Sequence, residues 1–79
     1  MRKNFDKKII ERLKEMRIKS KLTQKEVAEK MSLTRTAISN YENGIREVSI
    51  IILEKLSDIY KCNPAYIAGW SDSKKRIKK

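Results

Sequence analysis

Apolar residues recur every three or four positions along most of the chain, in short stretches separated by polar turns. This spacing matches the period of a helix, and no stretch shows the alternation expected of a strand. The pattern predicts five short helices, over about 6–19, 23–31, 34–43, 49–61 and 63–69. The predicted fold class is therefore all-α, a compact five-helix bundle with turns of about three to five residues.

The ends of these predicted helices coincide with side chains that satisfy free backbone groups. The expected N-caps are Asn4 or Asp6, then Thr23, Thr34, Ser49 and Asn63. Glu26 lies three residues after Thr23 and completes a capping box. Pro64 suits the first position of a helix, while Gly44 and Gly69 suit the left-handed conformation that ends one.

A helical wheel predicts which side of each helix is buried. For the first, second and fourth helices, the expected inward-facing residues are Ile9, Ile10, Leu13, Met16, Val27, Ala28, Met31, Ile50, Leu53, Leu56, Ser57 and Tyr60. In the third helix, Ala37, Ile38 and Tyr41 share the inward arc. Its opposite arc has no acidic and no large apolar side chain, and consists of Arg35, Thr36, Ser39, Asn40 and Asn43.

Only about three residues, 32–34, separate the second and third predicted helices. So short a turn forces the helices to cross sharply, as in a helix-turn-helix. On the outer face of the third helix, Arg35 can form two hydrogen bonds with guanine, and Asn40 can pair with the edge of adenine. Thr36 can offer its hydroxyl, or its methyl group to a thymine methyl. An ordinary solvated polar face has the same residue types, so they do not by themselves decide for DNA.

A longer ordered set of residues carries a family resemblance. It consists of Leu22-Thr23-Gln24, Val27-Ala28, Thr34, Ile38-Ser39 and Tyr41-Glu42-Asn43-Gly44, with Leu13 and Arg17 upstream and Leu53, Leu56 and Asn63-Pro64-Ala65-Tyr66-Ile67-Ala68-Gly69-Trp70 downstream. At these spacings, about residues 6–70 resemble the Cro- and lambda-repressor-type (XRE-family) helix-turn-helix proteins of phages and bacteria. The resemblance implies a lambda-repressor-like DNA-binding domain over 1–70. It also implies a double-stranded DNA operator as partner, bound by the helix pair within 22–44.

The resemblance further implies roles for residues at matching positions. The implied base contacts are Arg35, Thr36 and Asn40, and the implied contacts with the DNA backbone are Gln24, Thr34, Ser39, Asn43 and Arg46. Gln24 would bind a phosphate together with the N-terminus of its helix, or is simply a polar first-turn residue. Thr34 is foremost an N-cap whose hydroxyl can also reach a phosphate. Arg46 is either a phosphate or minor-groove contact or a solvated loop arginine.

Arg17 and Glu42 match positions where the family has an ion pair between the first and third helices. On the wheel, Glu42 lies at the edge between the inner and outer faces, where a lone carboxylate would repel phosphate. A pair with Arg17 would neutralise this carboxylate and fix the third helix against the first. The alternative is two independent surface charges.

Ser32 departs from the family pattern, because the family usually has glycine at this position of the turn. A serine in the left-handed conformation costs about 1 kcal/mol relative to glycine. The turn therefore either accepts this cost or takes another form.

The net charge of the 79-residue chain is +10, and it is concentrated at the two ends. Residues 1–21 carry +6 and residues 70–79 carry +4, whereas 22–48 and 49–69 are each neutral. Such a balance suits a polyanion, either nucleic acid or an anionic membrane surface. The chain has a single cysteine, Cys62, and no histidine, which excludes an internal disulfide and the usual Cys/His metal clusters. No metal site and no cofactor is expected.

Residues 71–79 are expected to form a basic, mobile tail or linker, because they lack an apolar period. Their cations would bind DNA phosphates without sequence preference, remain solvated, or lead into a further domain. One helix-turn-helix covers few base pairs, so a homodimer on two half-sites is expected, at least on DNA. The candidates for its contact, most of them also candidates for the core, are Ile51, Ile52, Ile59, Tyr66, Ile67 and Trp70, together with the fifth helix.

The predicted function is a sequence-specific, double-stranded DNA-binding transcriptional regulator, a repressor of phage, prophage or mobile-element type. Alternatives on the same fold are a restriction–modification controller, an antitoxin-like autoregulator, and a protein- or membrane-binding module that has lost DNA binding. An enzyme is not expected, because the sequence has no histidine, no nucleophile with a paired base and no phosphate-binding glycine loop. The longest apolar run, 50–53, has four residues, so neither a signal peptide nor a membrane span is expected. A membrane partner is not expected. A small-molecule substrate is not expected either, and the expected location is the cytoplasm.

Overall fold

The computed structural model describes residues 7–74, which form five helices and no strand. The helices are α1 (Lys7–Lys19), α2 (Gln24–Met31), α3 (Arg35–Glu42), α4 (Ile50–Tyr60) and α5 (Pro64–Ala68). The predicted all-α fold with five helices is therefore confirmed, and the ends agree within the usual one to two residues. The expected caps Asn4 and Asp6, and residues 75–79 of the expected tail, lie outside the described residues.

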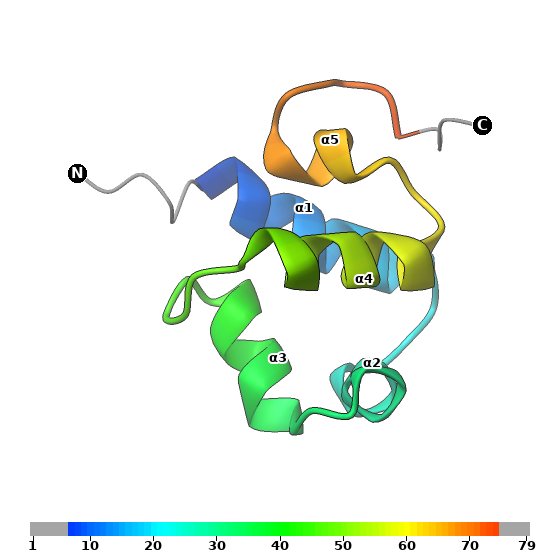
Figure 1. Cartoon of the computed structure of the whole chain (residues 1–79). Helices are drawn as coiled ribbons and strands as arrows, with labels where there is room; N and C mark the ends of the chain where they lie inside the picture. Colours follow the sequence, from blue (N-terminus) through cyan, green and yellow to red (C-terminus); the bar gives the residue numbers. More distant parts are fainter. Residues whose placement is uncertain (1–6, 75–79) are drawn as a thin grey trace.

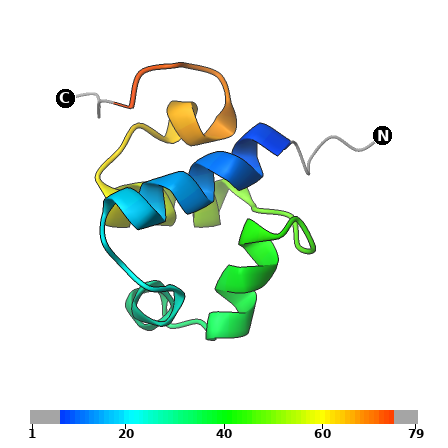
Figure 2. The same ribbon diagram turned by 180° about the vertical axis from the view of Figure 1, so that it is seen from behind.

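The helices are arranged in three layers (Figure 1). The α2–α3 pair lies at one end of the molecule, α1 and α4 cross its middle, and α5 lies at the other end. Seen from behind, α1 is in front of α4 and the order of the layers is the same (Figure 2). Because α1 packs on α3 and α5 while α4 packs on α2 and α5, the two middle helices connect the end layers.

The core lies between these layers and receives side chains from every helix. Its buried members are Leu13, Met16, Val27, Ala28, Ile38, Tyr41, Leu53, Leu56, Tyr60, Cys62, Tyr66 and Ile67. Most of the predicted inward-facing residues are thus buried or packed against the core. The prediction for Ile50 is wrong, because its side chain is 59% exposed. Ile50 is the first residue of α4, where the helix has not yet reached the neighbours that cover Leu53 and Leu56.

The described N-caps are the predicted ones. The Thr23 hydroxyl accepts from the Glu26 N–H at 3.1 Å, and the Glu26 carboxylate accepts from the Thr23 N–H at 2.8 Å, so the capping box is complete. The remaining caps accept one backbone N–H each, and they are Thr34, Ser49 and Asn63. Pro64 occupies the first position of α5, and Gly69 ends that helix with a φ of 86°. These local bonds explain why such short helices begin where they do.

Residues 71–74, here called the C-terminal strap, lie against α1 and α5 although the sequence places them in the expected tail. Arg12 of α1 donates to the carbonyls of Tyr66 and Ser71, at 2.6 and 3.0 Å, and to the Asp72 carboxylate at 3.1 Å. The Asn63 backbone N–H donates to the carbonyl of Lys74 at 3.0 Å. Hydrogen bonds therefore connect residues 71–74 to the rest of the chain, although 72–74 are exposed to solvent.

Candidate nucleic-acid interface

The turn between α2 and α3 fixes the angle between the two helices. Ser32 adopts the left-handed conformation, with φ 59° and ψ 40°, so the turn takes the form that costs about 1 kcal/mol relative to glycine. The next N–H, that of Leu33, donates back to the Ala28 carbonyl at 2.8 Å. α3 then begins at once, because the Thr34 hydroxyl accepts from the Ala37 N–H at 3.1 Å.

The two faces predicted for α3 are present in the structure. The inward residues Ala37, Ile38 and Tyr41 are all buried. Of the outward residues, Arg35, Thr36 and Asn43 are exposed, and Ser39 and Asn40 are half-buried. The sequence-predicted base contacts Arg35, Thr36 and Asn40 thus lie on one accessible surface of one helix.

Hydrogen bonds within and after α3 order the far end of this surface. The Asn43 side-chain amide donates to the Ser39 hydroxyl at 3.1 Å. The backbone carbonyl of Asn40 accepts from the N–H groups of Ile45 and Arg46, at 2.9 and 3.2 Å. Arg46 is itself exposed, and its guanidinium carbon lies 5.8 Å from the centre of the Tyr41 ring. The loop that carries Arg46 is therefore attached to the same helix that carries the implied base contacts.

Gly44 lets the chain leave α3 close to α1. Its φ is 75°, and a Cβ atom at this position would lie 2.7 Å from Cδ1 of Ile10. A larger residue would be strained by this left-handed conformation, and the end of the Ile10 side chain would have to shift to make room for it. The glycine thus allows the end of α3 to lie close to the first helix.

Arg17 and Glu42 meet in a two-bond ion pair. The Nε and Nη2 atoms of Arg17 donate to the two carboxylate oxygens of Glu42, at 2.7 and 3.2 Å. Arg17 also donates from Nη1 to the Leu22 carbonyl at 2.9 Å. The two side chains are only 13% and 4% exposed. The one acidic side chain of α3 is thus neutralised and buried, and the arginine also binds the backbone just before α2.

Gln24 extends this pair to the outer face. Its side-chain nitrogen donates to Glu42 Oε1 at 3.1 Å, and its Oε1 accepts from Nη1 of Arg35 at 3.2 Å. A carboxylate can only accept, so Gln24 must present its NH₂ group to Glu42 and its carbonyl oxygen to Arg35. A chain of hydrogen bonds therefore runs from Arg17 in α1 to Arg35 at the first position of α3.

The link between Gln24 and Arg35 is a feature that the sequence analysis missed. Two signals were available. Gln24 and Arg35 are the first residues of α2 and α3, two helices joined by a short turn. Arg35 and Glu42 are seven residues apart, which places them on the same side of α3 two turns from each other.

Comparison with known proteins identifies the architecture. A family model described as helix-turn-helix matches residues 13–67. The chain belongs to the helix-turn-helix family. The HTH-type transcriptional regulator ImmR of Bacillus subtilis (strain 168) is 40% identical to it over 65 residues, which are 82% of this chain and 51% of that protein. The chain thus spans about half the length of this curated relative. No solved structure gives a significant match.

The helix-turn-helix match covers α2, α3 and both members of the Arg17–Glu42 pair, and it ends before the C-terminal strap. The resemblance to the XRE family is therefore confirmed, and this family is not enzymatic. Within residues 7–74, no helix is long and apolar enough to span a membrane. The same residues contain no group of three or more acidic or cysteine side chains that could hold a metal ion.

Proposed function

We propose that this helix-turn-helix protein is a sequence-specific, double-stranded DNA-binding transcriptional regulator, and specifically a repressor of phage, prophage or mobile-element type. One observation carries the proposal. Arg35, Thr36 and Asn40 share the accessible face of α3, while Glu42, the one acidic residue of this helix, is buried in an ion pair with Arg17. A face of this kind offers donors and a methyl group to base edges without a charge that repels phosphate.

In the bound state, the outer face of α3 lies in the major groove of DNA. Arg35 donates to guanine O6 and N7, Asn40 pairs with adenine, and Thr36 contacts a thymine methyl or a phosphate. The backbone contacts are Gln24, Thr34, Ser39, Asn43 and Arg46. Gln24 keeps one N–H for a phosphate, because its other N–H donates to Glu42 and its carbonyl oxygen orients Arg35.

The geometry of α3 restricts the half-site. Arg35 and Asn40 are five residues apart, which corresponds to a rise of about 7.5 Å along the helix. Successive base pairs are about 3.4 Å apart, so this rise corresponds to at most about two base-pair steps along the duplex. The expected half-site therefore has a G·C pair and an A·T pair close to each other.

Repression follows when an occupied operator overlaps a promoter. The name of the relative ImmR, an HTH-type transcriptional regulator, supports a regulatory role for this chain. The net charge of +10 supplies attraction to DNA that does not depend on sequence. A homodimer on two half-sites is part of the proposal, since one helix-turn-helix contacts few base pairs. Binding to chromosomal or phage DNA places the protein in the cytoplasm.

Selection of duplexes from a random pool tests the proposal, because it gives the half-site, its symmetry and its spacing. On the selected duplex, we expect Arg35→Ala and Asn40→Ala each to cost about 1–3 kcal/mol of binding and to relax the preference at one base pair. Lys14→Ala is the matched control, because it removes an exposed cation of α1 and leaves α3 intact. The proposal fails if both α3 variants bind the selected duplex as tightly as the wild type.

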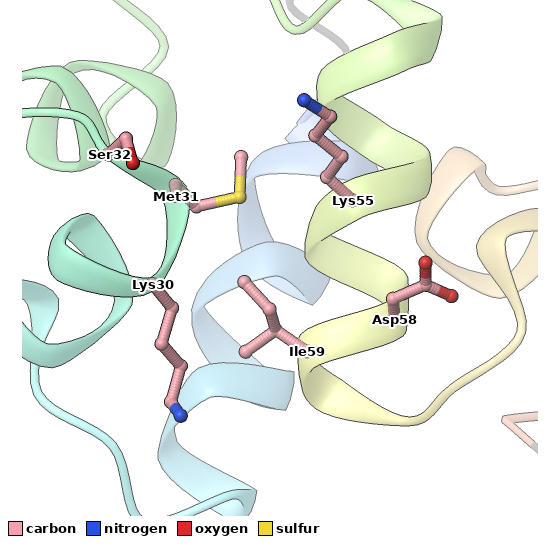
Figure 3. Close-up of a pocket in the computed structure, with 6 residues that line it drawn as sticks. All are labelled: Lys30, Met31, Ser32, Lys55, Asp58 and Ile59. Atoms are coloured by element: carbon pink, nitrogen blue, oxygen red, sulfur yellow. The ribbon is translucent and has the colours of Figure 1, made fainter.

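A protein-binding module is the second candidate, and one observation favours it. A hollow of about 420 Å³ lies between the end of α2 and α4. Met31 and Ile59 extend into the space between the two helices, with Lys30 and Lys55 at its ends (Figure 3). We rank this function second because the outer face of α3 lacks the apolar anchors that a partner helix needs. It would take first place if the pool yielded no preferred duplex.

A further inference from the structure

Three exposed isoleucines occur within seven residues of the chain, from the loop after α3 to the first turn of α4. The side chains of Ile45, Ile50 and Ile51 are 69%, 59% and 65% exposed. Only two other large apolar side chains among residues 7–74 are exposed to this degree, Ile18 in α1 and Trp70 after α5. Single exposed apolar residues are normal, whereas a group of them marks a contact surface. We call Ile45, Ile50 and Ile51 the isoleucine corner.

The charged residues beside this corner can pair with those of a second copy. Arg46 and Glu47 are adjacent and both exposed, and the segment 43–53 that contains them is neutral. The net charge of +10 is carried by the two ends of the chain, whereas residues 22–69, which include the corner, are neutral. A contact at the corner therefore brings no net charge of its own segment against a second copy. In a two-fold contact each residue meets its counterpart's neighbour, so Arg46 of each copy can approach Glu47 of the other.

The corner also lies in the right place for two copies to bind one duplex. It joins the end of α3 to the start of α4 (Figure 1), so it borders the helix that carries the implied base contacts. A two-fold contact at the corner can therefore place the two α3 helices next to each other on one side of the pair, as adjacent half-sites require. The main alternative from the sequence was α5, but its Tyr66 and Ile67 are 6% and 0% exposed and are already used by the core.

From this exposure, charge pattern and placement, we infer that the isoleucine corner is the surface through which a second copy of this chain binds. The role of the pair on an operator rests on the proposed function. Three isoleucines and two charged residues are fewer than the 20–30 residues and about 800 Å² per partner of a stable interface. The pair is therefore weak in free solution and is completed when two half-sites hold the copies together.

The first test uses no DNA, so that its outcome does not depend on the proposed function. Sedimentation equilibrium of the full chain over a range of concentrations measures self-association. We expect Ile51→Asn to weaken it by about tenfold, the effect of losing one buried aliphatic side chain. Ile18→Asn is the matched control, because Ile18 is 58% exposed, close to the 65% of Ile51, but lies in α1. Equal effects of the two variants, or no self-association of the wild type at any concentration, would overturn the inference.

The second test uses the duplex selected from the random pool, with one and with two half-sites. Ile51→Asn should bind a single half-site like the wild type and lose the cooperativity between two. With Ile45→Cys, oxidation on the two-site duplex should give a disulfide-linked pair, whereas Ile18→Cys should give none. The native Cys62 does not interfere, because it is 1% exposed. If Ile51→Asn keeps the cooperativity between two half-sites, the inference is contradicted. If the wild type does not bind a single half-site, the proposed function is contradicted instead.

Discussion

Two arginines of α1 fasten two different parts of the chain by similar chemistry. Arg17 binds α3 through Glu42 and a backbone carbonyl, and Arg12 binds the C-terminal strap through Asp72 and two backbone carbonyls. The arginine side chains are almost equally buried, at 13% and 15% exposure. Their carboxylate partners differ completely, because Glu42 is 4% exposed and Asp72 is 95% exposed.

The difference shows that the environment of the carboxylate decides what an arginine contributes. Water can solvate Asp72 whether or not Arg12 is present, so this pair is worth little by itself. Glu42 has lost its water and depends on Arg17 and Gln24 for every compensating bond shown. At the strap, the bonds of Arg12 to part-buried backbone carbonyls should matter more than its charge pair.

The largest effect should come from breaking the buried pair on one side. Arg17→Met leaves the Glu42 carboxylate buried without a cation, and we expect a loss of about 3–5 kcal/mol in the free energy of unfolding. Glu42→Gln in the Arg17→Met background removes the stranded charge and should recover a large part of this loss. Urea denaturation of the single and double variants measures both. A double variant no more stable than Arg17→Met alone would contradict the role assigned to the Glu42 charge.

A smaller effect is expected at the strap. Arg12→Met removes the donor to Tyr66 and Ser71, and we expect a loss of about 2 kcal/mol. Asp72→Asn is the matched variant, because it removes only the exposed charge, and it should unfold close to the wild type at moderate salt. Denaturation at low and high salt checks both variants. An Asp72→Asn loss as large as that of Arg12→Met would mean that the charge pair, rather than the backbone bonds, holds the strap.

The smallest effect concerns Glu15, which faces the strap from α1. The Tyr66 hydroxyl donates to Glu15 at 2.7 Å and lowers the pKa of this carboxyl below its ordinary value of 4.5, and Lys74 acts in the same direction. Because the folded-state pKa is lowered, the resulting stability is present above pH 4.5 and is lost as the pH falls through the lowered pKa. Tyr66→Phe should raise the Glu15 pKa toward its ordinary value and reduce this acid-side loss. NMR titration of the Glu15 side chain gives the pKa directly, and an unchanged value in Tyr66→Phe would contradict the assignment.

Much of the fold is predictable from the sequence because its signals are local. Thr23, Glu26, Thr34, Ser49 and Asn63 act on backbone groups two or three residues away, so a linear pattern contains the whole interaction. The inward arc of α3 follows from helical periodicity in the same way. The prediction of these caps and of this helix face does not depend on tertiary contacts.

The missed features depend on contacts between distant residues. Arg12 is an ordinary basic residue in the sequence, and its three partners lie 54 to 60 positions away. Ile50 has the correct period for burial, but it lies at an end of its helix that no neighbour covers. Prediction of the Gln24–Arg35 hydrogen bond requires the crossing angle of α2 and α3 in addition to the residue types. Periodicity gives the direction in which a side chain points but not what lies there.

The C-terminal strap also has a practical consequence for fusion and immobilisation of this protein. Arg12 and Asn63 hold the chain against α1 and α5 as far as Lys74, on the side of the molecule away from α2 and α3 (Figures 1 and 2). The protein is about 30 Å across. A fluorescent protein or a sensor surface joined after Lys74 is therefore attached on the side opposite to α2 and α3. Attachment there leaves the outer face of α3 open, and a tether that joins two copies in tandem must be long enough to pass around the molecule.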